Sequence, residues 1–206
     1  MKANGIGPNG SRPKRTVCIV GNAPTRILAR GEPDDVEIWG TSLGFRLLPR
    51  IDRWFELHAD KSLRINVPPT NDKGYMSWLQ SFKGKVYVLE PDPEIPQGIV
   101  YPTKAIIERF GHYLTDTIAY ELALAIYEGV TCIKLYGVDM ALDEEYAGQR
   151  PCVLYYLGIA KGAGNEIVLP EESALNPGKE HVGNRDYLAK GNTEYLPGTF
   201  QRRVHA

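Results

Sequence analysis

Short apolar runs rich in β-branched residues recur along the chain and predict the strands of a sheet. The first run, residues 16–20 (TVCIV), is almost continuously apolar, which is typical of a parallel strand covered on both faces. Similar runs predict further strands over residues 35–40, 53–57, 85–89, 132–136 and 166–169. Three prolines within residues 91–96 exclude a helix interior or a central strand there, because proline has no backbone N–H to donate.

Helical periodicity is clearest over residues 115–128, where apolar residues recur at every fourth position: Ile118, Leu122 and Ile126. Thr115 is the expected N-cap of this helix, with Asp116 in its first turn and Gly129 at its end. Weaker patterns predict helices over residues 44–50, 75–82, 103–110 and 149–161. In the last of these, Pro151 is tolerated only in the first turn. Strands that alternate with helices predict an α/β fold: a Rossmann-like, mostly parallel sheet with helices on both faces.

Length and composition predict one folded domain with two irregular ends. The 206 residues suit a single domain, which we expect over residues 15–174. Residues 1–14 are rich in Gly, Pro and Asn and predict a flexible N-terminal arm. Residues 175–206 are polar and without periodicity. We expect them to form a C-terminal tail that is either disordered or a wrapping arm, which in a homo-oligomer would join subunits.

Charge, hydropathy and cysteine content exclude several classes of protein. The formal net charge of −1 argues against bulk nucleic-acid binding, which needs a net positive field. No apolar run approaches the roughly 18 residues of a membrane span, and the N-terminus lacks the apolar core of a secretory signal, so we expect a cytoplasmic protein. The three cysteines, Cys18, Cys132 and Cys152, lack the spacing of a disulfide framework or a common zinc module. Cys18 and Cys132 lie in apolar runs, where we expect buried, inert thiols.

Small, hydroxyl and amide residues follow the predicted strands, which is where an open parallel sheet binds its ligands. They are Gly21, Asn22, Ala23 and Thr25 after the first strand, Thr41 and Ser42 after the second, His58 after the third, and Gly137 and Asp139 after the fifth. Exposed backbone N–H groups at a helix start, such as that at Thr115 and Asp116, favour an anion, so we expect a phosphate ligand. No Gly-x-Gly-x-x-Gly or P-loop motif is present. Gly21 and Asn22 therefore indicate either a phosphate site or only a tight turn, since both use the same residue types.

His58 and Asp139 are the candidates for catalysis. The imidazole of His58 would act as a general base near neutral pH, with Glu56 or another nearby carboxylate raising its pKa. The alternative is a histidine that only hydrogen-bonds a loop carbonyl, because a place at a strand end does not establish geometry. Asp139 could bind Mg²⁺ or ribose hydroxyls, or cap a turn. Arg26 and Arg150 could clamp a phosphate with their planar guanidinium groups, or lie solvated at the surface.

Four short blocks of the sequence resemble a known family. Residues 17–25 (VCIVGNAPT) resemble the Gly-Asn-Gly-Pro-Ser turn of the bacterial lipooligosaccharide sialyltransferases and of the family of the motility accessory factor and the archaeal hydroxymethylpterin diphosphokinase. Residues 114–117 (LTDT) resemble the sialyltransferase Thr-Ser-Gly helix start, and residues 132–140 (CIKLYGVDM) are similar to its strand ending in Gly-Ile-Asp. VLP (168–170) and SAL (173–175) resemble its closing strand and Asn-Ser-Leu-Leu segment. The blocks follow the family order over residues 16–175.

The resemblance implies a Rossmann-like site for a cytidine nucleotide. The residues that it assigns to nucleotide contacts are Asn22, Thr25, Thr41 or Ser42, Thr115 and Asp116, and it places Tyr146 against phosphate. Ala23 departs from the family pattern, because a glycine stands there in the sialyltransferases. Met140 and Ala141 stand where one of two phosphate-binding tyrosines falls. The sialyltransferases carry their catalytic histidine between the Gly-Ile-Asp strand and the last helix, and this sequence has none after Asp139 in that interval.

Together these patterns predict a protein that binds a nucleotide or a nucleotide-sugar. If it is catalytic, we expect a transferase of the glycosyl or phosphoryl type that acts mainly by stabilising phosphate, with Mg²⁺ as the candidate cofactor. An alternative is a non-catalytic protein that sequesters a nucleotide or second messenger, as a compact phage protein would. A third interpretation is a structural oligomer joined through residues 175–206.

Overall fold

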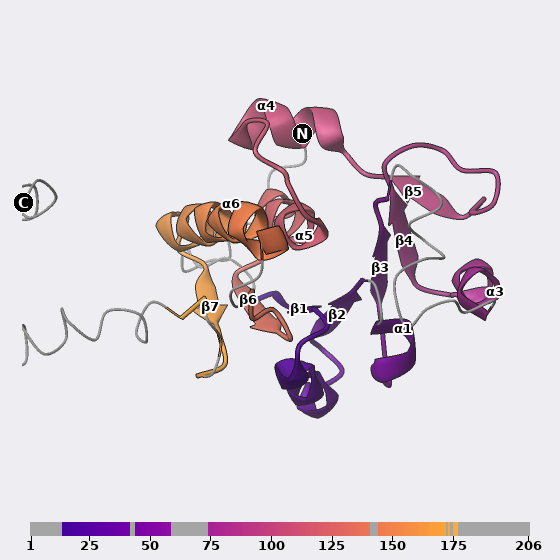
Figure 1. Ribbon diagram of the computed structural model, residues 1–206, viewed down its shortest axis with the longest axis horizontal. Helices are drawn as coiled ribbons and strands as arrows, with labels where there is room; N and C mark the ends of the chain where they lie inside the picture. Colours follow the sequence, from indigo (N-terminus) through magenta and orange to yellow (C-terminus); the bar gives the residue numbers. More distant parts are fainter. Residues whose placement is uncertain are drawn as a thin grey trace, which may run out of the picture. The chain divides into compact units, whose positions relative to one another are not determined.

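A seven-stranded parallel sheet organises the part of the chain that the structure describes (Figure 1). Its strands are β1 (Thr16–Val20), β2 (Glu37–Gly40), β3 (Arg53–Glu56), β4 (Lys85–Val88), β5 (Gly98–Val100), β6 (Cys132–Tyr136) and β7 (Glu166–Val168). They lie in the order β5-β4-β3-β2-β1-β6-β7, and every neighbouring pair is parallel. The carboxyl ends of all these strands therefore lie along one edge of the sheet, which we call the carboxyl edge.

The structure is a computed structural model. It describes residues 14–41, 44–58, 74–140, 144–171, 173, 175 and 176, without the side chains of residues 144–147. The chain divides into two units, Met1–Leu175 and Asn176–Ala206, and the helices and strands of the described residues belong to the first. The arm expected over residues 1–14 and the tail expected over residues 175–206 fall almost wholly outside the described residues and stay predictions.

Helices cover both faces of the sheet (Figure 1). On one face lie α4 (Thr103–Phe110), α5 (Thr117–Tyr127) and α6 (Glu144–Gly162), whose apolar side chains form one core cluster with alternate residues of β1, β3 and β6. On the other face lie the 3₁₀ helix η1 (Pro24–Gly31), α1 (Gly44–Leu47) and α3 (Gly74–Ser81), which close two smaller clusters. This arrangement confirms the expected α/β, Rossmann-like fold.

The first strand is buried on both faces, as its sequence predicts. Val17, Cys18, Ile19 and Val20 are each 0% exposed. Val17 and Ile19 pack in the cluster with α5 and α6, whereas Cys18 and Val20 pack in the cluster with η1, since side chains alternate along a strand. The expected burial of Cys18 and Cys132 is confirmed, and Cys152 is buried as well. Burial raises the pKa of all three thiols, which keeps them protonated and inert.

The N-cap of α5 lies one residue after Thr115, the residue expected from the sequence. Its N-cap is Asp116, whose carboxylate accepts a hydrogen bond of 3.0 Å from the amide of Ala119. The Thr115 hydroxyl donates to the same carboxylate at 3.2 Å, so it supports the cap and does not form it. The expected end at Gly129 is confirmed: this residue has φ +77° and donates to the carbonyl of Ile126.

Two elements, η1 and β5, are not predicted by the sequence pattern, and one helix is longer than its pattern indicates. Ile99 and Val100 of β5 are exposed, so the strand lacks the burial pattern of the others. The prediction that Pro151 lies in a first turn is wrong, because α6 begins at Glu144 and contains this proline in its interior. Proline has a φ near the helical value, so α6 continues through Pro151, although one amide hydrogen bond is lost and the ring crowds the preceding turn.

An ion-pair network ties the amino ends of three strands to the end of α5. The Arg53 side chain is 4% exposed, and it donates from Nε to Glu37 at 2.6 Å and from Nη1 to Glu128 at 2.8 Å. Arg15 donates to the second oxygen of the same two glutamates, at 2.9 and 2.8 Å. Burial alone would raise the pKa of Glu37, but hydrogen bonds from Arg53 and Arg15 hold it at about 2.

A second buried carboxyl group, that of Glu121 in α5, lies in the apolar core. Its side chain is 0% exposed, and neither oxygen has a hydrogen-bond partner among the described residues. Burial, followed by the charge of Asp116, raises its pKa well above the ordinary value of 4.5. The folded state therefore keeps a proton that the unfolded chain releases near pH 4.5, and the free energy of unfolding falls as the pH rises above that value.

Glu121→Gln is expected to melt at a higher temperature than the wild type at pH 8, by roughly a few °C, and at nearly the same temperature at pH 4.5. The amide is uncharged at both pH values, so the substitution removes the ionisation while keeping the shape. Thermal unfolding followed by circular dichroism measures the difference. Glu108→Gln, at an exposed position of α4, is the control. A gain that does not depend on pH, or one shared by the control, would contradict this account of Glu121.

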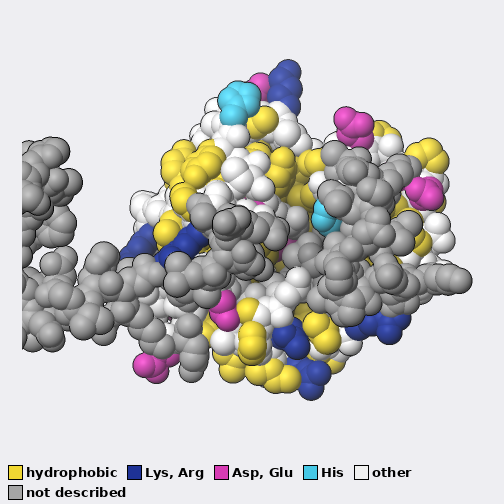
Figure 2. Space-filling view, viewed as in Figure 1, with side chains coloured by type: hydrophobic (Ala, Val, Ile, Leu, Met, Phe, Trp, Pro, Cys, Tyr) yellow, Lys and Arg dark blue, Asp and Glu magenta, His cyan; other side chains and the backbone are white. Residues whose placement is uncertain are grey.

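Charged side chains are dispersed over the face shown in Figure 2. Lys and Arg side chains lie there at several separate places, with Asp, Glu and apolar side chains between them. Among the described helices, none has a stretch that is both long and apolar enough to cross a bilayer.

Candidate functional site

The strand order creates a topological switch point between β1 and β6. From β1 the chain continues to β2, β3, β4 and β5 on one side of the sheet, whereas β6 and β7 lie on the other. The connection after β1 leads to η1 on one face, and the connection after β6 leads to α6 on the opposite face. Open α/β sheets bind ligands in the crevice that such diverging connections leave at the carboxyl edge. The turn after β1 and the end of β6 are therefore the candidate ligand site.

Two glycines bring the backbones of this site into direct contact. A Cβ atom on Gly21 would lie 2.4 Å from the carbonyl oxygen of Gly137, and one on Gly137 would lie 2.6 Å from that of Gly21. Gly137 also has φ +67°, which favours glycine. The amide of Ala23 donates to the Gly137 carbonyl at 2.9 Å. The two glycines thus serve a contact within the chain, which fixes the turn after β1 against the end of β6.

Side chains from both connections meet around this contact. The Thr25 hydroxyl accepts from the amide of Gly137 at 2.8 Å and donates to Asp139 at 3.4 Å, so it links the two connections. Arg26 Nη1 donates to the carbonyl of Asn22 at 2.6 Å. The Asn22 side chain is exposed, and those of Arg26 and Asp139 are half-buried. The structure therefore brings together an amide, a guanidinium and a carboxylate at the switch point.

Other residues predicted from the sequence make contacts with other parts of the chain or fall outside the described residues. Thr41 is buried and donates to the carbonyl of Phe55 at 3.3 Å, which makes it part of the packing between β2 and β3. Asp116 caps α5 through its own carboxylate, so this helix end is already satisfied by a negative group. Arg150 lies half-buried in α6. Ser42 and the side chain of Tyr146 fall outside the described residues.

His58 follows β3 at the same carboxyl edge and is paired with Glu56. Its Nδ1 lies 2.7 Å from Glu56 Oε1, and its backbone amide donates to the same oxygen at 3.4 Å. The Glu56 side chain is 3% exposed, whereas that of His58 is 29% exposed. Because a carboxylate can only accept, this hydrogen bond requires the proton on Nδ1, and in the neutral ring Nε2 is then the nitrogen that carries the lone pair.

Two further residues, Tyr75 and Trp54, extend this pair into the core. The Tyr75 hydroxyl donates to the second oxygen of Glu56, and Trp54 Nε1 donates to the Tyr75 oxygen at 2.9 Å. The sequence analysis did not select either residue. Trp54 could have been found from its position two residues before Glu56 on one strand, which puts both side chains on one face. No spacing in the sequence relates Trp54 or Glu56 to Tyr75, which lies in the separate helix α3.

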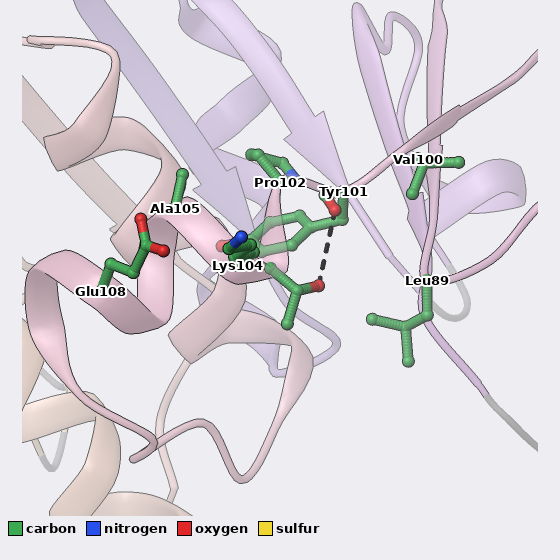
Figure 3. A pocket seen from close by; sticks show the side chains of 8 residues that line it. Leu89, Val100, Tyr101, Pro102, Lys104, Ala105 and Glu108 are labelled. Atoms are coloured by element: carbon green, nitrogen blue, oxygen red, sulfur yellow. Dashed lines mark hydrogen bonds between the residues drawn. The ribbon is translucent and has the colours of Figure 1, made fainter.

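A cavity of about 460 Å³ opens beside α4, further along the carboxyl edge (Figure 3). It is lined by Leu89, Val100, Tyr101, Pro102, Thr103, Lys104, Ala105 and Glu108. Figure 3 shows Leu89 and Val100 on one side and the first turns of α4 on the other. None of these residues belongs to the switch-point group. The cavity lies at the ends of β4 and β5, and β4 is the neighbour of β3, which His58 follows.

The candidate cofactor Mg²⁺ was assigned from the sequence to Asp139. Among the described residues, no group of three or more His, Cys, Asp or Glu side chains lies close enough to hold a metal ion. Mg²⁺ is commonly held by one or two carboxylates together with the phosphates of a substrate. The interpretations of Asp139 as a ligand of Mg²⁺, as a ligand of ribose hydroxyls or as the cap of a turn therefore stay predictions.

The parallel sheet and its switch point define a Rossmann-like α/β protein with a candidate ligand site at the carboxyl edge. No family model and no curated protein matches the sequence. Among solved structures, the chain is similar to the sialyltransferase CstII from Campylobacter jejuni in complex with cytidine-5'-monophosphate, with a TM-score of 0.49 and 15% identity, over 75% of this chain and 79% of that chain. A structure of the same enzyme in complex with CMP-3FNeuAc gives a TM-score of 0.49 and 13% identity over the same shares.

Proposed function

We propose that this protein binds a nucleotide-sugar at the switch point of its sheet and transfers the sugar to a hydroxyl group. The observation that carries the proposal is the pair formed by the buried Glu56 and the part-exposed His58, which stands at the same edge of the sheet as the turn after β1. A turn that can hold phosphate and a base that can accept a proton are the two requirements of such a transfer.

The nucleotide half of the site would be formed by the connections after β1 and β6. The Asn22 amide and the Arg26 guanidinium supply donors suited to phosphate oxygens, and the Asp139 carboxylate is an acceptor suited to ribose hydroxyls or a ligand for Mg²⁺. Thr25 would act by holding the two connections together. A cytidine nucleotide is the first ligand to test, because the sequence resemblance implies it.

The reaction would use His58 as its base. Nε2 accepts the proton of the attacking hydroxyl as the oxygen forms its bond to the sugar carbon. The bond from that carbon to the phosphate oxygen breaks. The oxygen keeps the electron pair, so the departing nucleotide carries one more negative charge. Arg26 would neutralise part of this charge, which stabilises the transition state more than the ground state.

The molecule that accepts the sugar would bind in the cavity beside α4. Neighbouring strands are about 4.8 Å apart, so the cavity at the ends of β4 and β5 lies one to two strands, roughly 5 to 10 Å, along the edge from β3, which His58 follows. Its apolar wall, formed by Leu89 and Val100, and its polar rim, formed by Lys104 and Glu108, suit a ligand with both apolar and hydroxyl groups.

Two measurements test the proposal. Binding to the folded state raises the melting temperature by mass action, so CMP-, UDP- and ADP-sugars and cyclic dinucleotides are compared by thermal shift. We expect a CMP-sugar to raise the melting temperature most. Mass spectrometry after incubation then looks for the released nucleotide. Recovery of the intact ligand from a stoichiometric complex would contradict transfer and favour sequestration, and no shift with any ligand would contradict nucleotide binding.

Asn22→Ala is expected to weaken binding of CMP about 10-fold or more, because a hydrogen bond to a charged phosphate is lost. The melting temperature without ligand should change little, because the Asn22 side chain is exposed. Isothermal titration calorimetry and thermal unfolding measure the two quantities. Thr25→Val is the matched control, since its hydroxyl joins the two connections and its loss should lower the melting temperature. Unchanged affinity in Asn22→Ala would show that the residue only shapes the turn.

A further inference from the structure

We infer that Tyr75 and Trp54 are positioning residues for His58: they fix the Glu56 carboxylate, which in turn keeps the imidazole proton on Nδ1 and leaves Nε2 to accept a proton at the carboxyl edge. The use of Nε2 as a base rests on the proposed function, whereas the fixed tautomer is a property of the protein without substrate.

The hydrogen-bond chain runs from the core toward the surface. Trp54 is 0% exposed and donates from Nε1 to the Tyr75 oxygen at 2.9 Å. Tyr75, 5% exposed, donates to one oxygen of Glu56, and His58 Nδ1 lies 2.7 Å from the other. Each donor group in this chain has a named acceptor, so the direction of every hydrogen bond follows from the chemistry of the groups.

The Tyr75 hydroxyl is important because the carboxylate that it bonds is buried. A carboxylate at 3% exposure is costly unless hydrogen bonds replace the lost water. Tyr75 satisfies the oxygen that faces away from His58, so both sides of the carboxylate are held in one orientation. Removing the hydroxyl takes one hydrogen bond from a buried carboxylate, which loosens the orientation of the oxygen that faces Nδ1.

Aromatic packing holds Tyr75 in place. Trp54 and Glu56 share one face of β3, and α3 brings Tyr75 against that face. The ring of Trp78 in α3 lies 4.8 Å from that of Trp54, edge to face, and the ring of Phe45 lies 5.1 Å from that of Tyr75. These rings form an apolar surrounding in which the hydrogen bonds to Glu56 are stronger than in water.

The nitrogen chemical shifts of the imidazole rings test the inference, because they distinguish the Nδ1–H tautomer from the Nε2–H tautomer that predominates in free histidine side chains. We expect His58, assigned by the signal that His58→Gln removes, to be protonated on Nδ1 in the neutral form. Tyr75→Phe keeps the ring and removes the hydroxyl, so the Nε2–H form should gain population. With the nucleotide-sugar that binds best, initial rates should give Tyr75→Phe a kcat about 10-fold lower than that of the wild type, with KM little changed.

Tyr87→Phe is the matched control. Tyr87 is also a buried tyrosine next to β3, but its hydroxyl bonds Arg53 on the opposite face. This variant should lower the melting temperature without changing the His58 tautomer. If both variants lower the melting temperature and neither changes the tautomer, the role of Tyr75 is structural and the inference is wrong.

Trp54→Phe provides a second variant, which removes the first donor of the chain together with part of the buried ring. An increase in the Nε2–H form of His58 that is smaller than in Tyr75→Phe supports the inference. An unchanged tautomer would show that Trp54 is not a positioning residue. The tautomer is read without substrate. A shifted tautomer in a protein that binds no nucleotide would therefore support positioning while contradicting the proposed function.

Discussion

Replacing His58 with glutamine is expected to lower the rate of nucleotide release from a bound nucleotide-sugar by about 10²- to 10⁴-fold, the usual contribution of a general base. Glutamine keeps a polar side chain next to Glu56 but cannot accept a proton at neutral pH. Binding of the nucleotide itself should change little, because His58 lies two strands away from the switch point. The initial rate, followed by mass spectrometry of the free nucleotide, and the affinity, from calorimetry, measure the two effects separately.

His112→Gln is the control for this substitution. His112 is exposed and lies between α4 and α5, so the rate should stay within about two-fold of the wild type. A wild-type rate in His58→Gln would remove His58 from catalysis and leave its interaction with Glu56 as a structural feature of the loop. An equal loss in both variants would point to a general effect on the protein.

Arg53→Met is expected to lower the free energy of unfolding by about 3 kcal/mol, which corresponds to roughly 6 to 12 °C in melting temperature for a chain of this length. The substitution leaves Arg15 to pair with both Glu37 and Glu128. We place the loss at the lower end of the range for buried pairs, because the two glutamates are 33% and 24% exposed. Urea unfolding at pH 7 measures the loss.

The pH dependence of this loss has a definite sign. The folded state holds the pKa of Glu37 at about 2, below its ordinary value of 4.5, so the group stabilises the fold above pH 4.5 and this contribution disappears as the pH falls toward 2. The difference between the wild type and Arg53→Met should therefore shrink between pH 7 and pH 3. A difference that stays constant over this interval would show that the loss comes from packing alone.

Arg15→Met is the matched control for Arg53→Met, because Arg15 pairs with the same two glutamates from a more exposed position. The Arg15 side chain is 32% exposed, against 4% for Arg53, so we expect its loss to cost about 1 kcal/mol. Equal losses in the two variants would contradict the account in which burial decides how much each arginine contributes.

Strands with a buried face are the part of the fold that the sequence predicts best. The run over β1 is recognised because all of its inner residues are buried, and α4 and α5 are recognised because their apolar residues recur with the helical period. β5 is missed because it has only three residues, fewer than the runs that predict a strand, and follows a proline-rich segment. The start of α6 is missed because a proline rule that holds on average does not hold at Pro151.

The candidate site is likewise predicted from the sequence only in part. A sequence shows which residues follow each strand, so it places Asn22, His58 and Asp139 at the carboxyl edge once the sheet is parallel. It also offers Glu56 or another nearby carboxylate as the partner of His58, and the structure shows that Glu56 is in contact with it. It cannot show that Gly21 packs against Gly137, or that Tyr75 reaches Glu56, because these contacts join elements far apart in the chain. The ion-pair network of Arg53 is hidden for the same reason.

A crystal structure of the protein with bound CMP tests the central claim most directly, since it locates the nucleotide on the sheet. The account predicts the phosphate beside the turn after β1, within hydrogen-bond distance of the Asn22 amide, and the ribose near Asp139. CMP bound elsewhere on the protein, with that turn empty, would contradict the account.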